Sequence, residues 1–197
     1  ELGNVPFNWS DPFLLNEQIS ESEGLIKNTA ENFALKELKP RIEKAYNDEL
    51  VDKEIFKRMG ETGFLGCTIP EEYGGIGSSY VSYGLIAREI ERIDSGYRSM
   101  MSVQSSLVMY PIYKFGNENQ RKKFLPRLAS GELIGCFGLT EANSGSDPAS
   151  MTTKAIKVDG GYELTGSKMW ISNAPIADIF IIWAKSNHHQ NKIKGFI

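Results

Sequence analysis

Two stretches in the last third of the chain combine small polar residues with residues that favour strands. The first stretch, residues 136–150, passes from apolar residues into a run of Asn, Gly, Ser, Asp and Pro. This composition is typical of a strand that opens into a loop, where backbone amides and hydroxyls can face a ligand. The second stretch, residues 166–174, surrounds Trp170 with small hydroxyl and amide residues. Together the two loops could wall a site for a planar cofactor, although a plain surface turn after a strand has the same spacing.

Composition and charge limit the class of protein. The 197 residues are 41% hydrophobic and 24% charged, which is enough for one large domain or two small ones. A net charge of -3 gives no basic field for nucleic acid or anionic lipid. Cys67 and Cys136 lie in apolar segments, which indicates buried free thiols in a reducing compartment rather than a disulfide or a metal site. With no targeting segment or membrane-spanning run in view, we expect no secretion, no membrane insertion and no nucleic-acid binding.

Helix signals fill residues 1–131, which we predict to form an amino-terminal helical domain. A loop rich in Gly and Pro, residues 70–77, interrupts them. The predicted helices run from Ser20 to near Pro40, from Asp52 to Gly63, from Ser78 or Ser79 past Ile93, through residues 99–113, and from Asn117 to Gly131.

The segment of residues 99–113 contains no charged residue, and its apolar residues recur on all sides. It is too short to cross a bilayer, so we predict a helix buried in the middle of a bundle and kinked by Pro111. We expect the 197-residue polypeptide to expose apolar surface of this helix and to be prone to association.

Arg98 stands at the entry of this buried helix, with Ser95 as a candidate N-cap. The helix dipole disfavours a cation there and favours an anion, so a negatively charged ligand is one interpretation. The other is that Arg98 reaches solvent or pairs with Asp94 or Glu91.

Residues 132–197 favour strands, and we predict a mainly antiparallel β domain with a hairpin turn at residues 159–161. The fold class is therefore α+β, a helical bundle followed by a barrel-like β domain. The last strand would leave an open edge, so we expect this domain to be incomplete. The predicted strands are residues 133–139, 153–158, 162–165, 168–172, 179–185 and 194–197.

Residues 138–150, GLTEANSGSDPAS, and residues 168–173, KMWISN, resemble the two flavin motifs of the acyl-CoA dehydrogenases, in the family's order. The resemblance includes residues 70–75 and covers essentially the whole chain. Within the family, residues 97–109 resemble the helix of the glutaryl-CoA dehydrogenases in which an Arg-Ser pair meets the free carboxylate of the substrate.

The resemblance implies an FAD site and a substrate site. Substrate contacts fall on Arg98 and Ser99 for the distal carboxylate and on Ser146 for the thioester. Ala142 and Ser172 replace the family's common Pro and Thr, and we expect small effects. The implied FAD contacts are Phe137, Gly138, Leu139, Thr140, Gly145, Ser146, Trp170, Ile171 and Ser172.

The implied activity of the complete enzyme is FAD-dependent α,β-dehydrogenation of glutaryl-CoA with decarboxylation to crotonyl-CoA and CO2, a step of lysine and tryptophan degradation. The family's catalytic glutamate belongs to a carboxy-terminal helical domain that we expect to be absent here, so no glutamate of this chain is assigned that role. We therefore expect the 197-residue polypeptide alone to hold FAD weakly and to be inactive.

The resemblance also implies partners and location: an acyl-CoA substrate, electron-transfer flavoprotein as acceptor, a homotetramer or dimer at full length, and the cytoplasm of a bacterium or the mitochondrial matrix of a eukaryote. Two alternatives remain open. One is an acyl-CoA dehydrogenase of another chain specificity, with Arg98 merely structural. The other is a catalytically inactive fragment that binds ligands or assembles.

Overall fold

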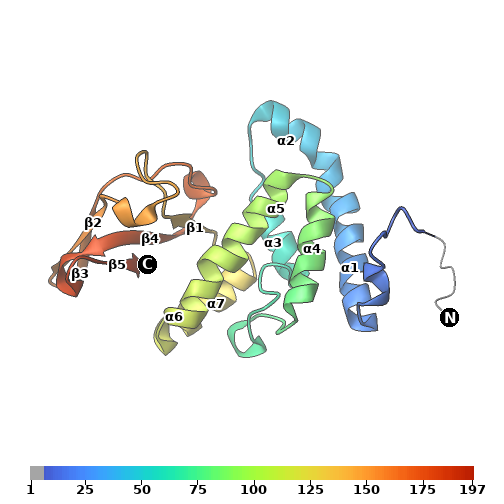
Figure 1. Cartoon of the computed structure of the whole chain (residues 1–197), viewed down its shortest axis with the longest axis horizontal. Coiled ribbons are helices and arrows are strands. Elements are labelled where there is room, and N and C mark those ends of the chain that lie inside the picture. The colour runs from blue at the N-terminus through green and yellow to red at the C-terminus, as the bar shows by residue number, and fades with distance from the viewer. Residues whose placement is uncertain (1–6) are drawn as a thin grey trace.

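In the computed structural model, which describes residues 7–197, helices occupy the chain as far as Ala129 and strands follow from Gly135 (Figure 1). This confirms the α+β class. None of the helices in the described part has the length and apolar composition to cross a membrane. The helices are α1 Glu21–Phe33, α2 Ile42–Asp48, α3 Glu54–Glu61, α4 Tyr80–Glu91, α5 Ser95–Ser102, α6 Tyr110–Phe115 and α7 Glu118–Ala129, with short 3-10 and π turns between several of them.

Side-chain caps fix the beginnings of α1, α4 and α7 at residues that the sequence predicts. Ser20 and Asn117 each form a complete capping box, with α1 and α7 respectively, and Ser79 caps α4 through the amide of Ser82. These caps confirm the predicted starts, because each one satisfies an amide that the helix itself leaves unpaired. The sequence predicts that helical structure ends near Pro40, and this prediction is wrong. Pro40 lies at the start of a 3-10 turn, where its missing N–H costs little, and α2 follows directly.

The predicted central helix is a continuous rod of α5, a π-helical segment Val103–Met109 and α6. Pro111 lies near the start of α6 and has no amide to donate, and the irregular turns precede it. The N-cap is Asp94, whose carboxylate accepts from the Tyr97 amide at 2.9 Å, and the prediction of Ser95 is wrong. A carboxylate is the better cap here because it also meets the positive end of the helix dipole.

The five strands of residues 7–197 form one mixed sheet organised around β4. β4 runs parallel to β1 and, near its end, to β2, whereas the β2–β3 and β4–β5 pairs are antiparallel hairpins. The strands are β1 Gly135–Gly138, β2 Lys154–Val158, β3 Gly161–Thr165, β4 Ile179–Ser186 and β5 Lys192–Phe196. The predicted strand over residues 168–172 does not form, and the reason lies in the functional site described below.

Gln104 fastens the helical part to the sheet. It lies in the π-helical segment and is fully buried. Its amide nitrogen donates to the carbonyls of Leu128 at 2.9 Å and Leu133 at 2.7 Å, and its amide oxygen accepts from the Gly135 amide at 2.8 Å. One side chain thus satisfies backbone groups at the end of α7 and at the start of β1.

An apolar cluster surrounds this joint. It combines side chains of the rod and of α7 with Ile181 of β4, and the half-buried Phe137 and Trp183 pack against it. The rings of these two aromatic residues meet edge to face at 5.9 Å between centroids. The sheet therefore packs on the helices in a defined position, and this also fixes the positions of the loops that follow its strands.

Replacing Gln104 by Leu keeps the apolar packing but leaves the Leu133 carbonyl and the Gly135 amide without partners, whereas the Leu128 carbonyl still accepts from the Gly131 amide. Because a buried polar group without a partner costs roughly 1–3 kcal/mol, we expect the free energy of unfolding to fall by about 3 kcal/mol. Urea denaturation followed by circular dichroism measures this change. The exposed Gln18, changed to Leu, is the matched control, expected to shift by less than about 0.5 kcal/mol. A Gln104→Leu protein as stable as its parent would contradict the role of Gln104 as the joint.

Candidate functional site

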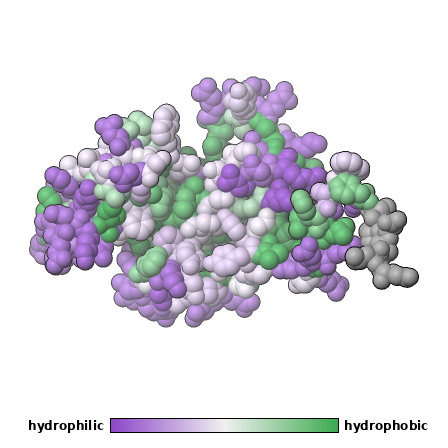
Figure 2. Space-filling view, viewed as in Figure 1, coloured by the Kyte–Doolittle hydropathy of each residue, from purple (hydrophilic) through white to green (hydrophobic). Residues whose placement is uncertain are grey.

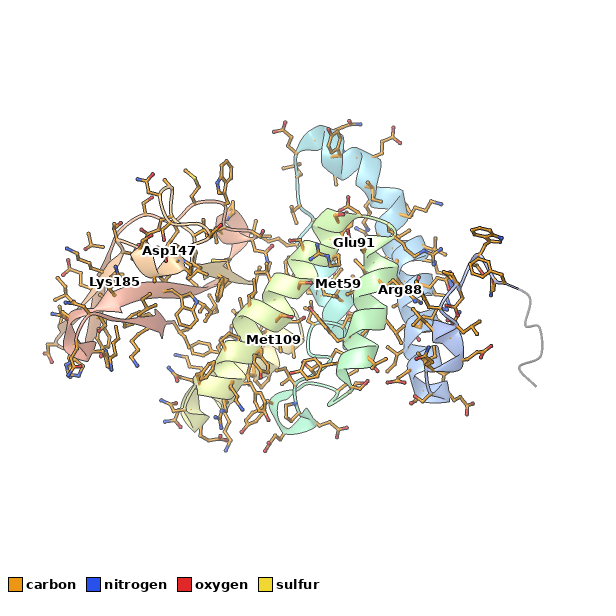
Figure 3. The ribbon with its side chains drawn as sticks, viewed as in Figure 1. Met59, Arg88, Glu91, Met109, Asp147 and Lys185 are labelled. Carbon is orange, nitrogen blue, oxygen red and sulfur yellow. The ribbon has the colours of Figure 1, made fainter. Side chains whose placement is uncertain are left out.

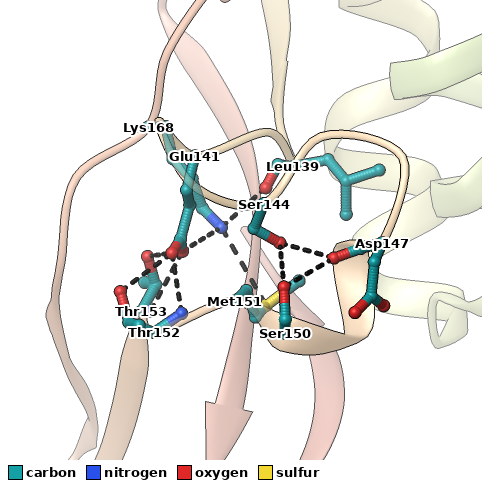
Figure 4. A network of polar contacts seen from close by, with 9 residues as sticks. All are labelled: Leu139, Glu141, Ser144, Asp147, Ser150, Met151, Thr152, Thr153 and Lys168. Carbon is teal, nitrogen blue, oxygen red and sulfur yellow. Dashed lines mark hydrogen bonds and ion pairs between the residues drawn. The ribbon is translucent and has the colours of Figure 1, made fainter.

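A buried carboxylate lies at the centre of the two loops that carry the sequence motifs (Figure 4). Glu141 is 6% exposed. Its oxygens accept from the Thr152 amide at 2.7 Å, the Thr152 hydroxyl at 2.9 Å, the Thr153 amide at 3.0 Å and the Thr153 hydroxyl. The two threonines immediately precede β2, so Glu141 ties the first stretch to the start of that strand.

Lys168 completes this environment and joins the two stretches. Its ammonium donates to Glu141 Oε1 at 2.9 Å and to the carbonyl of Leu139 at 2.9 Å, and its side chain is only 9% exposed. The next amide, that of Met169, donates to the carbonyl of Thr140 at 2.9 Å. Both stretches are thus held together by a buried ion pair and a backbone hydrogen bond, which we call the loop clamp.

The surroundings of Glu141 favour its charged form. Burial raises the pKa of the carboxyl, but the hydrogen bonds from Thr152, Thr153 and Lys168 together outweigh burial and hold the pKa well below its ordinary value. A carboxylate that accepts this many hydrogen bonds stays ionised at neutral pH. It has neither the basicity nor the free lone pairs to take a proton from a substrate.

The rest of the first stretch is held by its own hydrogen bonds. The backbones of Glu141 and Ser144 exchange two hydrogen bonds of 3.1 and 3.0 Å, which close a turn. The Ser144 and Ser150 hydroxyls both donate to the carbonyl of Asp147, at 2.7 and 2.9 Å. The exposed outer loop around Gly145 and Ser146 is therefore shaped without help from the helices.

The second stretch is irregular, which corrects the strand predicted over residues 168–172. Trp170 and Asn173 have φ angles of 60° and 68°, a left-handed backbone that a strand cannot contain. Lys168 and Met169 bond to the first stretch, and the side-chain amide of Asn173 donates to the carbonyl of Gly135 at 3.2 Å. Hydrogen bonds to the first stretch thus take the place of strand pairing in this segment. The Trp170 side chain is left 85% exposed.

The predicted flavin residues occupy three kinds of position. Phe137 and Gly138 belong to β1, and the Phe137 ring lies against Trp183 of β4 and packs on the apolar cluster described above. The residues that follow the strand or flank Trp170 are half-buried, namely Leu139, Thr140 and Ile171. The remaining ones are exposed, namely Gly145, Ser146, Trp170 and Ser172. They all come from the two clamped stretches and the strand that leads into the first.

Thr140 has unused hydrogen-bonding groups. Its carbonyl accepts from Met169, but within residues 7–197 neither its amide nor its hydroxyl has a partner. Backbone amides in folded proteins are nearly always paired with protein, water or ligand. The Thr140 amide and hydroxyl are therefore available to a ligand.

Arg98 is held by an acidic residue of the preceding helix. Its Nε donates to Glu91 Oε2 at 2.6 Å, and the side chain is 36% exposed. This geometry agrees with the structural alternative raised from the sequence, pairing with Glu91. Its two terminal nitrogens have no partner within the described residues, so the guanidinium keeps donors that point elsewhere.

Ser99 and Ser172 meet at one hollow. A cavity of about 430 Å³ lies between α2, the start of α5 and the second stretch, and both serines line it with Asn173 and Tyr97. Figure 2 shows hydrophilic residues on the tip of α2 and apolar residues below it, towards the hollow. Arg98 and Ser146 do not line this cavity. The structure thus brings Ser99 to the second flavin motif but leaves Arg98 and Ser146 outside that hollow.

The sequence reasoning missed four residues as functional candidates: Glu141 and Lys168 of the loop clamp, and Thr152 and Thr153, which donate to Glu141. A signal was present, because Lys168 is the one charged residue of its stretch, and Glu141 shares the first stretch with a single other charge, Asp147. Burying a single charge in such surroundings is costly, so two opposite charges in neighbouring loops indicate an ion pair between them.

The two thiols follow the sequence expectation. Cys67 and Cys136 are both free and buried, and burial raises the pKa of each thiol to about 11, so neither is a nucleophile at neutral pH. Among the described residues, no group of three or more His, Cys, Asp or Glu side chains could hold a metal ion.

Known families match this chain along almost its whole length. The profile of the acyl-CoA dehydrogenase N-terminal domain matches residues 20–132, and that of the middle domain matches residues 136–197. An acyl-CoA dehydrogenase of Bacillus subtilis (strain 168) is 40% identical over 181 residues, which are 91% of this chain and 48% of the relative.

Solved structures of glutaryl-CoA dehydrogenases are also similar to this chain. A glutaryl-CoA dehydrogenase from Mycobacterium smegmatis is 42% identical with a TM-score of 0.89, over 95% of this chain and 48% of its own. A glutaryl-CoA dehydrogenase from the same organism in complex with FADH2 is 41% identical with a TM-score of 0.88, over 93% of this chain and 47% of its own. The chain thus spans about half the length of these relatives.

The low pKa of Glu141 predicts a pH dependence. A carboxyl whose pKa is depressed by folding stabilises the protein above its unfolded value, near 4.5, and this stabilisation is lost as the pH falls below that value. We expect Glu141→Gln to be less stable than the parent at neutral pH, and the difference to shrink as the pH falls from about 6 to about 3. Urea denaturation at a series of pH values measures both proteins. Parallel stability profiles would show that Glu141 does not carry this pH dependence.

Proposed function

Because the chain belongs to the acyl-CoA dehydrogenase family, we propose that its two clamped stretches bind FAD and an acyl-CoA thioester for α,β-dehydrogenation. The observation that carries this proposal is the combination of the exposed Trp170 indole with the unpaired Thr140 amide and hydroxyl on two loops tied together. The FADH2 in the M. smegmatis structure supports the choice of cofactor.

The residues present fit a flavin. An isoalloxazine ring offers a flat apolar face and a polar pyrimidine edge, and Trp170 with Ile171 can pack on the face while Thr140 bonds to the edge. A Cβ at position 145 would meet no atom within 4 Å, so the backbone there is open to the approach of a diphosphate. When bound, FAD supplies the acceptor for the hydride that leaves the β carbon.

This chain's own residues would bind and orient the substrate. Ser146, on the exposed part of the first stretch, is proposed to contact the thioester, and Leu139 to pack beside the ring. Glu141 is excluded as the base that removes the α proton, because Lys168 and the two threonines occupy its oxygens. We propose electron-transfer flavoprotein as the acceptor that reoxidises the enzyme.

We further propose glutaryl-CoA as the substrate, with loss of CO2 to give crotonyl-CoA. The Arg98-Ser99 pair and the similar glutaryl-CoA dehydrogenases support this choice over other acyl chains. A distal carboxylate is costly to desolvate unless a fixed cation receives it, and the terminal nitrogens of Arg98 have donors left for one. Glu91 would hold the guanidinium in place through Nε while the terminal nitrogens face the ligand.

Trp170→Ala should weaken FAD binding. Stacking by an aromatic ring adds about 0.5–1.5 kcal/mol beyond the burial of its surface, so we expect the dissociation constant to rise by roughly tenfold. Titration of the chain with FAD, followed by quenching of flavin fluorescence, measures this. Trp9→Ala is the matched control, since Trp9 is 88% exposed in the segment before α1. Equal affinities of the two variants would remove Trp170 from the site, and no FAD binding by the parent chain would overturn the proposed function.

Arg98→Gln should alter the choice of acyl-CoA. Removing one partner of a desolvated ion pair typically costs about 2–5 kcal/mol, so affinity for glutaryl-CoA should fall at least tenfold while affinity for butyryl-CoA is unchanged. Calorimetric titration of the FAD-loaded chain with each ligand measures this selectivity.

The control for this experiment is Arg92→Gln, which also removes an ion-paired arginine of the helical part but one that faces Glu89 and Glu31. It should leave both affinities unchanged. If Arg98→Gln lowers both affinities equally, or lowers neither, the glutaryl assignment loses its support and only the broader family activity remains.

A further inference from the structure

We propose that Glu141 and Lys168 are positioning residues of the flavin site, which orient and polarise the Leu139–Thr140 peptide so that the Thr140 amide donates to the flavin. This inference rests on the proposed function, because it assigns the ligand of that amide. It assigns to the loop clamp a role in cofactor chemistry beyond holding two loops together.

The orientation follows from the hydrogen bonds of two successive peptide units. In a trans peptide the C=O and the N–H point to opposite sides of the chain. Both polar groups of the Thr140–Glu141 peptide are hydrogen-bonded, since the Thr140 carbonyl accepts from the Met169 amide and the Glu141 amide donates to the Ser144 carbonyl. In the Leu139–Thr140 peptide only the carbonyl is hydrogen-bonded within the described residues, because the Leu139 oxygen accepts from the Lys168 ammonium. Its N–H therefore points away from Lys168 and, among the described residues, has no partner.

The charge on Lys168 strengthens this donor. A cation bonded to a carbonyl polarises the peptide, and in a site shielded from water this makes the opposite N–H a better hydrogen-bond donor. Lys168 is 9% exposed and 2.9 Å from the Leu139 oxygen, so little solvent screens the effect. A stronger donor favours the state of the ligand with more negative charge, which for a flavin is the reduced state.

Glu141 is needed to keep the ammonium there. An unpaired buried ammonium would lose its proton or turn to solvent. Glu141 holds it from the side opposite to Leu139, and Thr152 and Thr153 fix Glu141 in turn. Figure 4 shows this sequence of contacts from the threonines through Glu141 and Lys168 to Leu139.

The experiment removes the pair without leaving a buried charge. Lys168→Met alone would strand the Glu141 carboxylate and could prevent folding, so the decisive variant is the double change Glu141→Gln with Lys168→Met, which is neutral and close in volume. Its matched control is Glu89→Gln, because Glu89 is also a buried carboxylate paired with basic residues, Arg88 and Arg92. In Figure 3 Arg88 lies on the helices, well away from Asp147 of the first stretch.

Three readouts separate a positioning role from a merely structural one. In the chain without ligand, hydrogen exchange of residues 139–144 and 168–173 should be faster in the double variant than in the parent and the control. With FAD, the dissociation constant should rise at least tenfold, and the midpoint potential of the bound flavin should fall because the reduced state loses a polarised donor. Glu89→Gln should lower stability and change neither flavin property.

The outcomes are distinguishable. A double variant that binds FAD with the parent's affinity and midpoint potential, even with faster exchange, overturns the positioning role and leaves the proposed function intact. A parent chain that binds no FAD overturns the proposed function itself, and the assignment of the Thr140 amide with it.

Discussion

A carboxylate and an ammonium that are both shielded from water impose the constraint on which the candidate site depends. Neither charge is tolerable there without the other, since a lone buried ion costs several kcal/mol. Glu141 and Lys168 come from different stretches, so satisfying both charges forces the two stretches to meet at one place. The irregular backbone of residues 168–173 follows from this requirement, because the segment that delivers Lys168 to Glu141 cannot also pair as a strand.

The position of the loop clamp depends in turn on how the sheet packs on the helices. The first stretch leaves β1, and β1 is fixed at its start by Gln104 of the rod and along its length by β4. A shift of β1 relative to the helices would therefore displace both Leu139 and Thr140, which directly follow this strand. The absence of charge in residues 99–113 of the rod is explained by this geometry, since the rod is in contact with α4, β1 and α7. A single buried amide side chain then satisfies the backbone groups that this contact would otherwise leave unpaired.

The sequence predicted what depends on local signals and missed what depends on contacts between distant residues. Ser20, Ser79 and Asn117 were recognised as helix starts because a cap acts within three residues of itself. The buried rod was recognised from its composition alone. The strand over residues 168–172 was wrong because its apolar and hydroxyl residues fit a strand, whereas the Lys168 contacts that override this preference come from residues 139 and 141. Glu141, Thr152 and Thr153 went unassigned for the same reason, and the family resemblance supplied most of the candidate site.

The central claim is that the clamp presents the Thr140 amide to a flavin, and the most direct measurement is the response of that amide to FAD. In a nitrogen-labelled chain titrated with FAD, the amide resonance of Thr140 should shift and its proton should become protected from exchange. The neighbouring Glu141 amide, already bonded to Ser144, should keep its protection. A Thr140 amide that exchanges equally fast with and without bound FAD would contradict the account.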